Sequence, residues 1–105
     1  PTRLARHGKV LHSDGDFSIK RAEWAACPDP IDLECECPAC ARYSRGYLRH
    51  LFNTKELLGH RLLSLHNLSY TIRLMASARA AVAEQRFAAF HRATVQRRAE
   101  PPIAR

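Results

Sequence analysis

The chain has 105 residues, of which 46% are hydrophobic and 26% are charged, and its formal net charge is +7. This length allows one domain with a small core and excludes a multidomain organisation. No apolar run is long enough to cross a membrane and no segment resembles a signal peptide, so we expect a cytoplasmic protein without a membrane partner.

The positive charge lies in the second part of the chain. Residues 1–41 carry five basic and seven acidic side chains, whereas residues 42–105 carry twelve basic and three acidic ones. Fourteen of the 17 basic residues are arginine, which can make two hydrogen bonds to one phosphate group. A polyanion such as RNA is therefore one candidate partner, and a solvated helix surface is the alternative.

The first 26 residues are expected to form a loop followed by a β-hairpin. Residues 1–8 contain proline, glycine and two arginines, which indicates a loop. Residues 10–12 and 17–20 flank the sequence SDGD, in which Asp-Gly is typical of a hairpin turn. Pro1 stands where an initiator Met would, so we expect the chain to be part of a longer protein.

Helices are expected after residue 40. Residues 27–34 are too rich in Pro and Asp for a long helix or strand. Ser44 is predicted to cap a short helix that runs through about Phe52. Asn53 and Thr54 then supply a predicted second cap just before Lys55.

Apolar side chains beyond residue 55 recur at steps of three, four and seven. This spacing predicts one apolar packing stripe on a long helix or on two abutting helices. A last amphipathic stretch contains Phe87, Phe90, Thr94 and Val95, and residues 100–105 are expected to be a frayed tail. The stripe consists of Leu58, Leu62, Leu65, Ile72, Met75 and Val82.

Cys35, Cys37 and Cys40 form the most informative cluster in the chain. Three thiols cannot all pair with one another as disulfides, but together with one imidazole they can form a closed Cys3His structural zinc site. Pro38 favours this interpretation, because a Cys-Pro-x-Cys turn is bent and leaves backbone amides free to donate toward sulfur. The alternatives are an oxidised CxxC pair or three unrelated thiols.

The residue types and their spacing do not select the fourth ligand of the proposed zinc site. His50, His60 and His66 follow Cys40 after nine, nineteen and twenty-five intervening residues, and zinc folds use loops of each kind. His66 lies on the apolar side of the predicted helix, where a buried ring needs a metal or a backbone carbonyl as its partner. Cys27, upstream of the cluster, is the other candidate.

Three segments carry a family resemblance: PTRLARHG, CECPACARYSRGYLRHLF and ELLGHRLLSLHNLSYTIRLM. Together they resemble the C-terminal part of bacterial tRNA-guanine transglycosylases over residues 1–95, through the motifs CxCxxC, YxRxYLxHL and HNL. The resemblance implies the end of a (β/α)8 barrel with a zinc-binding insertion. The expected fold of this chain is therefore mainly α, with a short β-hairpin and a zinc knuckle at residues 35–40.

The resemblance also implies an organisation and an activity. Residues 1–26 would follow the barrel strand of the catalytic aspartate, and residues 27–99 would form the zinc-binding helical subdomain and the last barrel helices. Such enzymes exchange the wobble guanine of GUN-anticodon tRNAs for a 7-deazaguanine in queuosine biosynthesis. An aspartate attacks the ribose C1′ and expels guanine, and the incoming base resolves the covalent intermediate.

Catalytic residues are not expected in this chain. In the family, the nucleophile lies just upstream of the PTR motif, and the second catalytic aspartate and the base pocket lie far earlier. Asp14 and Asp16 are in the predicted hairpin turn and do not substitute for them. The isolated chain is therefore expected to be inactive. A non-catalytic zinc-knuckle RNA-binding module or partner subunit is the alternative function, and a protein–protein adaptor is a weaker one.

Other roles can be transferred by position. The family's zinc ligands match Cys35, Cys37, Cys40 and His66, which leaves Cys27 as a free thiol. The TRxxR element that contacts the tRNA anticodon loop matches Thr2, Arg3, Leu4, Ala5 and Arg6. The aromatic cluster at the homodimer contact matches Tyr43, Tyr47 and His50, for which local packing against the zinc knuckle is the alternative.

Overall fold

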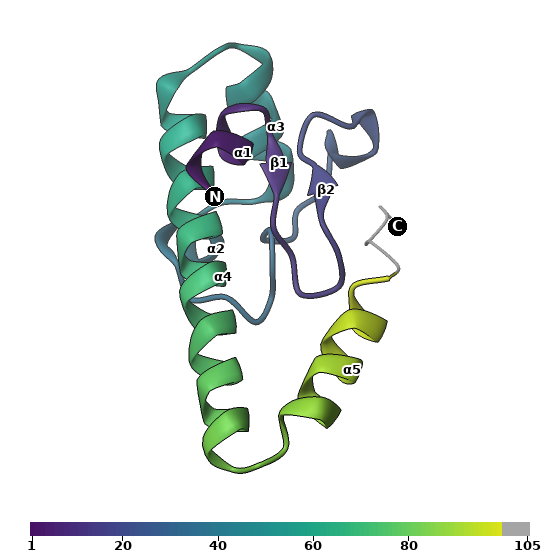
Figure 1. The fold of residues 1–105 in the computed structure, drawn as a ribbon. Coiled ribbons are helices and arrows are strands. Elements are labelled where there is room, and N and C mark those ends of the chain that lie inside the picture. The colour runs from purple at the N-terminus through teal and green to yellow at the C-terminus, as the bar shows by residue number, and fades with distance from the viewer. Residues whose placement is uncertain (100–105) are drawn as a thin grey trace.

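The computed structural model describes residues 1–99, so the expected frayed tail at 100–105 lies outside the described residues. The chain is mainly helical with one two-stranded hairpin, as expected (Figure 1). Among the described residues, no helix has both the length and the apolar composition needed to cross a membrane. The elements in chain order are α1 (Thr2–Arg6), β1 (Lys9–Val10), β2 (Phe17–Ser18), the 3-10 helix η1 (Ala22–Trp24), α2 (Pro38–Arg42), α3 (Arg45–Asn53), α4 (Leu57–Ala83) and α5 (Phe87–Arg97).

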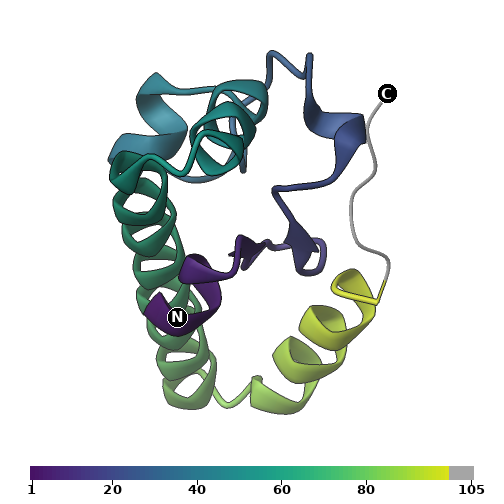
Figure 2. The same ribbon diagram turned by 90° about the horizontal axis from the view of Figure 1, so that it is seen from above.

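Helix α4 is the longest element, and the other α-helices pack against it. α1, α2, α3 and α5 all contact it, as does strand β1. α5 folds back from the C-terminal end of α4 (Figure 1). Seen from above, the hairpin lies between α4 and α5 (Figure 2). A single helix therefore connects the knuckle, the hairpin and the N-terminal segment.

The predicted hairpin is confirmed, although its strands are shorter than expected. β1 and β2 pair antiparallel, with Lys9 opposite Ser18 and Val10 opposite Phe17. Gly15 has φ +118° in the connecting turn, a conformation that residues with a side chain rarely adopt. The turn position that the Asp-Gly pair predicted is therefore confirmed.

The N-terminal segment is helical, so the prediction of a loop over residues 1–8 was wrong. The N–H of Ala5 donates to the carbonyl oxygen of Pro1 at 3.1 Å, and α1 ends at Arg6, two residues before Gly8, which has φ +79°. Ala5 is fully buried. A five-residue helix is not stable by propensity alone, so its packing on α4 decides the conformation.

The cap predicted for α3 is confirmed, but the one predicted for α4 is wrong. The Ser44 hydroxyl accepts a hydrogen bond from the N–H of Tyr47 at 3.1 Å. Thr54 ends α3, and α4 begins after Glu56. The N–H groups of Lys55 and Glu56 donate back to the last carbonyl groups of α3, and Lys55 adopts φ +57°. These residues therefore form the C-terminal Schellman motif of α3 instead of a cap for α4.

The predicted apolar stripe on α4 is mostly exposed, so it does not belong to the core of this chain, and its other interpretation as a packing surface stays a prediction. Only Leu62 of the six residues is buried, and the others are 40–68% exposed. Apolar residues occupy two opposite faces of α4, so the spacing alone could not select the one that packs inside. The buried residues of α4 are Gly59, Leu62, Leu63, His66, Asn67, Tyr70 and Ala81.

Helix α5 contains the predicted last amphipathic stretch, but none of its residues is buried. Ion pairs connect its C-terminal end to the rest of the molecule. Arg97 contacts Asp14 at 2.6 Å and Glu34 at 2.9 Å, and Arg98, which follows the helix, contacts Asp16. The two aspartates of the hairpin turn thus hold the end of α5.

The core lies between the hairpin, the loop over residues 27–34 and helices α2 to α4. Trp24 is fully buried, and its indole N–H donates to the carbonyl oxygen of Ser18 at 3.0 Å. The three knuckle cysteines belong to the same cluster, so the core and the knuckle are continuous. The largest fully buried apolar side chains of the core are Val10, Ile19, Trp24, Ile31, Leu48 and Leu63.

Candidate metal centre

The three knuckle cysteines are brought together by a turn that ends in α2. Pro38 occupies the first turn of α2, where its missing N–H removes no helical hydrogen bond. The N–H of Cys37 donates to Cys35 Sγ at 3.5 Å, and the N–H of Cys40 donates to Cys37 Sγ at 3.4 Å. Backbone dipoles thus point at sulfur and stabilise negative charge there, as the Cys-Pro-x-Cys pattern predicted.

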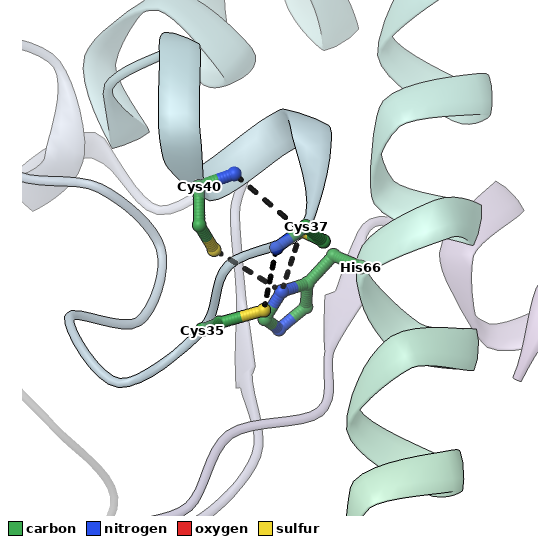
Figure 3. Close-up of side chains that lie close together, drawn as sticks. All are labelled: Cys35, Cys37, Cys40 and His66. Atoms are coloured by element: carbon green, nitrogen blue, oxygen red, sulfur yellow. Dashed lines mark hydrogen bonds between the residues drawn. The ribbon is translucent and has the colours of Figure 1, made fainter.

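His66 approaches the same point from α4 (Figure 3). Its ring is fully buried, and Nδ1 lies 3.3 Å from Cys40 Sγ and 3.7 Å from Cys37 Sγ. On the other side of the ring, Nε2 lies 2.8 Å from the carbonyl oxygen of Leu11. A carbonyl can only accept, so Nε2 carries the proton and the Nδ1 lone pair is available to a metal.

The four side chains fit a zinc ion. Their ligand atoms all lie within 4.8 Å of one another, and all four residues are buried. Around a tetrahedral zinc, sulfur and nitrogen ligands are separated by about 3.6 Å, a distance that lies between the two Nδ1 to Sγ separations. Three thiolates and one imidazole form a donor set typical of structural zinc. With four protein ligands, no coordination position remains for a substrate.

The other candidates for the fourth ligand lie elsewhere. Cys27 is a free thiol whose sulfur lies 4.0 Å from a carboxylate oxygen of Asp29. His60 packs against the ring of Phe52, and His50 is exposed. Within residues 1–99, the group of possible metal ligands is Cys35, Cys37, Cys40 and His66. The choice of His66, which the spacing alone left open, is confirmed.

In the metal-free group, the Cys37 and Cys40 thiols interact in a way that favours ionisation of Cys37 over that of Cys40. A hydrogen bond from the Cys40 thiol lowers the pKa of Cys37 to about 3, against the opposing effect of burial. The same hydrogen bond and burial raise the pKa of the Cys40 thiol. A metal bound by all three sulfurs must displace the proton on Cys40, so its affinity falls as the solution becomes more acidic.

Comparison with known proteins identifies the family. The profile of the family described as queuine tRNA-ribosyltransferase matches residues 1–100. This chain belongs to the queuine tRNA-ribosyltransferase family. The resemblance seen in the sequence motifs is therefore confirmed.

Curated relatives of the queuine tRNA-ribosyltransferase family support the same assignment. The enzyme of that name from Desulfosudis oleivorans is 54% identical over 93 residues, which are 89% of this chain and 24% of the relative. The one from Fusobacterium nucleatum is 48% identical over 97 residues, which are 92% of this chain and 26% of the relative. The chain therefore spans about a quarter of the length of these relatives.

In this member of the queuine tRNA-ribosyltransferase family, the five predicted RNA-binding residues are those of helix α1. Arg3 and Arg6 are exposed, as are Thr2 and Leu4. Ala5 is fully buried and faces α4. Four of the five predicted side chains are thus accessible to a partner, whereas Ala5 anchors the helix.

The predicted interface residues lie beside the knuckle. The rings of Tyr43 and Tyr47 stack, with centroids 5.2 Å apart and an angle of 15° between their planes. Tyr43 packs partly against the core, whereas Tyr47 and His50 are exposed. The two tyrosines also line a shallow hollow with Pro28 and Pro30. Local packing thus buries part of the Tyr43 side chain, whereas the side chains of Tyr47 and His50 remain accessible to a partner.

The sequence prediction missed the residue that follows the histidine ligand. Asn67 is fully buried, and its amide forms hydrogen bonds to the backbone of Pro1, Lys9 and Leu11. A polar side chain next to a predicted ligand on a helix was the signal that could have found it, because a buried amide must have partners.

Proposed function

We propose that this chain is the C-terminal, zinc-binding part of a tRNA-guanine transglycosylase. The complete enzyme would exchange the wobble guanine of GUN-anticodon tRNAs for a 7-deazaguanine, and the substrate base would bind in a part of the enzyme outside this chain. The buried Cys3His group in a chain of this family carries the proposal. A cytoplasmic location follows from the proposed tRNA substrate.

The proposed role of the zinc centre is structural. Zinc would be held by Cys35, Cys37, Cys40 and His66, which come from the knuckle and from α4. His66 also bonds to the backbone of Leu11, so the centre would connect three separate parts of the chain. This connection compensates for the small core that a chain of this size can form.

The proposed tRNA contact is the exposed surface of α1. Arg3 and Arg6 lie three positions apart, which brings two guanidinium groups close together on a short helix. Guanidinium groups can bind phosphates and stack on unpaired bases, as an anticodon loop requires. Thr2 and Leu4 would complete this surface, with Ala5 as the buried anchor.

The outer face of α4 supports the proposed barrel context. We define this face by the exposed side chains Leu57, Leu58, Leu65, Leu68, Ile72 and Met75. A patch of this kind is typical of a surface that another part of a protein covers. Because the relatives are about four times as long as this chain, we propose that their barrel covers it. Residues 1–26 would follow the catalytic strand, and residues 27–99 would form the subdomain and the last barrel helices.

The proposed homodimer contact is the exposed aromatic surface beside the knuckle. Tyr47 and His50 are exposed on α3, and aromatic side chains are common at the centres of interfaces. Tyr43 packs against the core cluster that contains the three knuckle cysteines, so zinc would stabilise this surface indirectly.

The proposed function can be tested with the product of the complete reading frame that encodes this chain (the full-length protein). Labelled guanine and a tRNA with a GUN anticodon are supplied, and incorporation at the wobble position is measured. We expect exchange, with a tRNA of another anticodon as the control. Failure of a folded, zinc-loaded protein to exchange guanine would contradict the proposal and favour the non-catalytic RNA-binding module or partner subunit.

A second arm tests where the chemistry is performed. Residues 1–105 alone are expected to show no exchange, because the proposed nucleophile lies outside this chain. Turnover by this piece would contradict the assignment of catalysis to the rest of the enzyme.

A further inference from the structure

We propose that Asn67 is a positioning residue that couples the zinc centre to the tRNA-contacting helix α1. The inference rests on the proposed function, because it assumes that Arg3 and Arg6 contact tRNA. It assigns a role to a side chain that lies neither among the metal ligands nor on the RNA surface.

The Asn67 amide is fully used in hydrogen bonding. Oδ1 accepts from the N–H of Leu11 at 3.0 Å, and Nδ2 donates to the carbonyl oxygens of Lys9 at 2.9 Å and Pro1 at 3.2 Å. The side chain is fully buried, so water cannot replace these partners. All three partners are backbone groups of the N-terminal segment, 56 to 66 residues away in sequence.

His66 and Asn67 hold the same residue from one helix. The N–H of Leu11 donates to Asn67, and the carbonyl oxygen of Leu11 accepts from His66 Nε2 at 2.8 Å. His66 presents its other nitrogen to the cysteine sulfurs. Ligation of a metal would fix the ring of His66, and through Leu11 it would fix the backbone that Asn67 also binds.

The third hydrogen bond of Asn67 reaches the beginning of α1. The carbonyl oxygen of Pro1 accepts from Nδ2 of Asn67 and also from the N–H of Ala5, which closes the first turn of the helix. With Ala5 buried against α4, the helix has a fixed direction and Arg3 and Arg6 point to solvent. Loss of the Nδ2 donor would let the first turn of α1 move. Arg3 and Arg6 would still be present, but their orientation would no longer be fixed.

The test uses Asn67→Asp in the full-length protein. Aspartate has the same shape and keeps an acceptor for Leu11, but it replaces the donor to Pro1 and Lys9 with an oxygen that repels both carbonyl groups. The matched control is Asn53→Asp, which adds the same charge at an exposed position at the end of α3. We expect the KM for tRNA to rise about tenfold in Asn67→Asp, with kcat and zinc content nearly unchanged, and no such rise in the control.

A double-mutant cycle with Arg6→Ala separates positioning from general support. If Asn67 acts through α1, the loss in tRNA affinity caused by Arg6→Ala should be much smaller in the Asn67→Asp background than in the wild type. Additive losses would overturn the inference. If Arg6→Ala alone leaves tRNA affinity unchanged, the proposed RNA surface fails instead, which distinguishes the two ideas.

A second variant keeps the inference testable if Asn67→Asp does not fold. Asn67→Ser adds no charge and removes the amide that donates to Pro1 and Lys9, and it enters the same cycle. If every substitution at position 67 removes zinc or lowers kcat as strongly as it raises KM, then Asn67 only maintains the structure and the inference is wrong.

Discussion

The guanidinium group of Arg45 lies over the indole ring of Trp24, with its central carbon 4.6 Å from the ring centroid. Its Nε donates to the carbonyl oxygen of Pro30 at 3.1 Å, and Nη2 donates to that of Ile31 at 2.8 Å. One side chain at the start of α3 therefore connects the core to the loop that leads into the knuckle. This contact explains how a loop rich in proline and aspartate is held in place.

Arg45→Lys is expected to weaken this loop. An ammonium group cannot make both carbonyl hydrogen bonds while it stacks on Trp24, so local stability should fall by about 1–3 kcal/mol. Hydrogen exchange of the backbone amides of residues 27–45 in the full-length protein would measure the loss. Arg42→Lys, at an exposed position in α2, is the control and should leave the exchange rates unchanged. Equal rates in both variants would contradict the role of Arg45.

Cys37→Ser should remove the zinc, because it deletes one of the four side chains that would hold the metal. Structural zinc sites have apparent binding free energies of about 10–16 kcal/mol, so the knuckle should unfold with the loss. Native mass spectrometry would report zinc per chain, and the melting temperature would report stability. Cys27→Ser is the control and should retain one zinc, since Cys27 lies outside the group. Retention of zinc by Cys37→Ser would show that another residue completes the site.

Lys55→Gly should stabilise the connection between α3 and α4. Lys55 adopts φ +57°, in the left-handed region that costs residues with a side chain about 1 kcal/mol or more. Glycine avoids this cost but loses more chain entropy on folding, so the net gain should be about 0.5–1 kcal/mol. Hydrogen exchange at the end of α3 would detect it. Lys55→Ala keeps the strained conformation and should bring no gain, which separates backbone conformation from loss of the charge.

The pH dependence of stability should have a contribution from His12. Burial lowers the pKa of this imidazole below its ordinary value near 6.5, against the attraction of Asp32. Nδ1 accepts a hydrogen bond from the N–H of Asp14 at 2.9 Å, which requires the neutral ring. The folded state therefore binds this proton less readily than the unfolded chain does. The stabilisation is complete above about pH 6.5 and is lost as the pH falls through the lowered pKa.

His12→Asn is the variant that tests this dependence. Its amide oxygen can accept from Asp14 without titrating, so the loss of stability between pH 7 and pH 5 should be smaller than in the wild type. Zinc content must be measured at each pH, because the metal ligands also bind protons in acid. An identical pH profile at constant zinc content would rule out a contribution from His12.

Asp32 should contribute in a more acidic range. Burial opposes its ionisation, but hydrogen bonds from the N–H of Glu34 and the hydroxyl of Ser13, together with the charge of His12, outweigh that effect and lower its pKa. Its stabilisation is therefore present above about pH 4 and is lost below that, as the carboxylate is protonated.

Features formed by neighbouring residues could be predicted from the sequence. The knuckle lies within six residues, and the hairpin turn and the Ser44 cap each depend on a few adjacent positions. The chemistry of thiolates, the Asp-Gly pair and the serine side chain restricts the local backbone to few arrangements. The amino-acid sequence by itself thus determined the donor types of the metal centre and, through its motifs, the family.

Contacts between distant segments were decided only by the tertiary structure. The two apolar faces of α4 satisfy the same spacing rule, and the packing of the knuckle and hairpin selects the one that is buried. α1 is too short to be recognised by periodicity and exists because Ala5 packs on α4. The hydrogen bonds of Asn67 span up to 66 residues, a separation at which no local pattern specifies the partner. Burial of a polar group demands partners, but only the folded chain determines which ones they are.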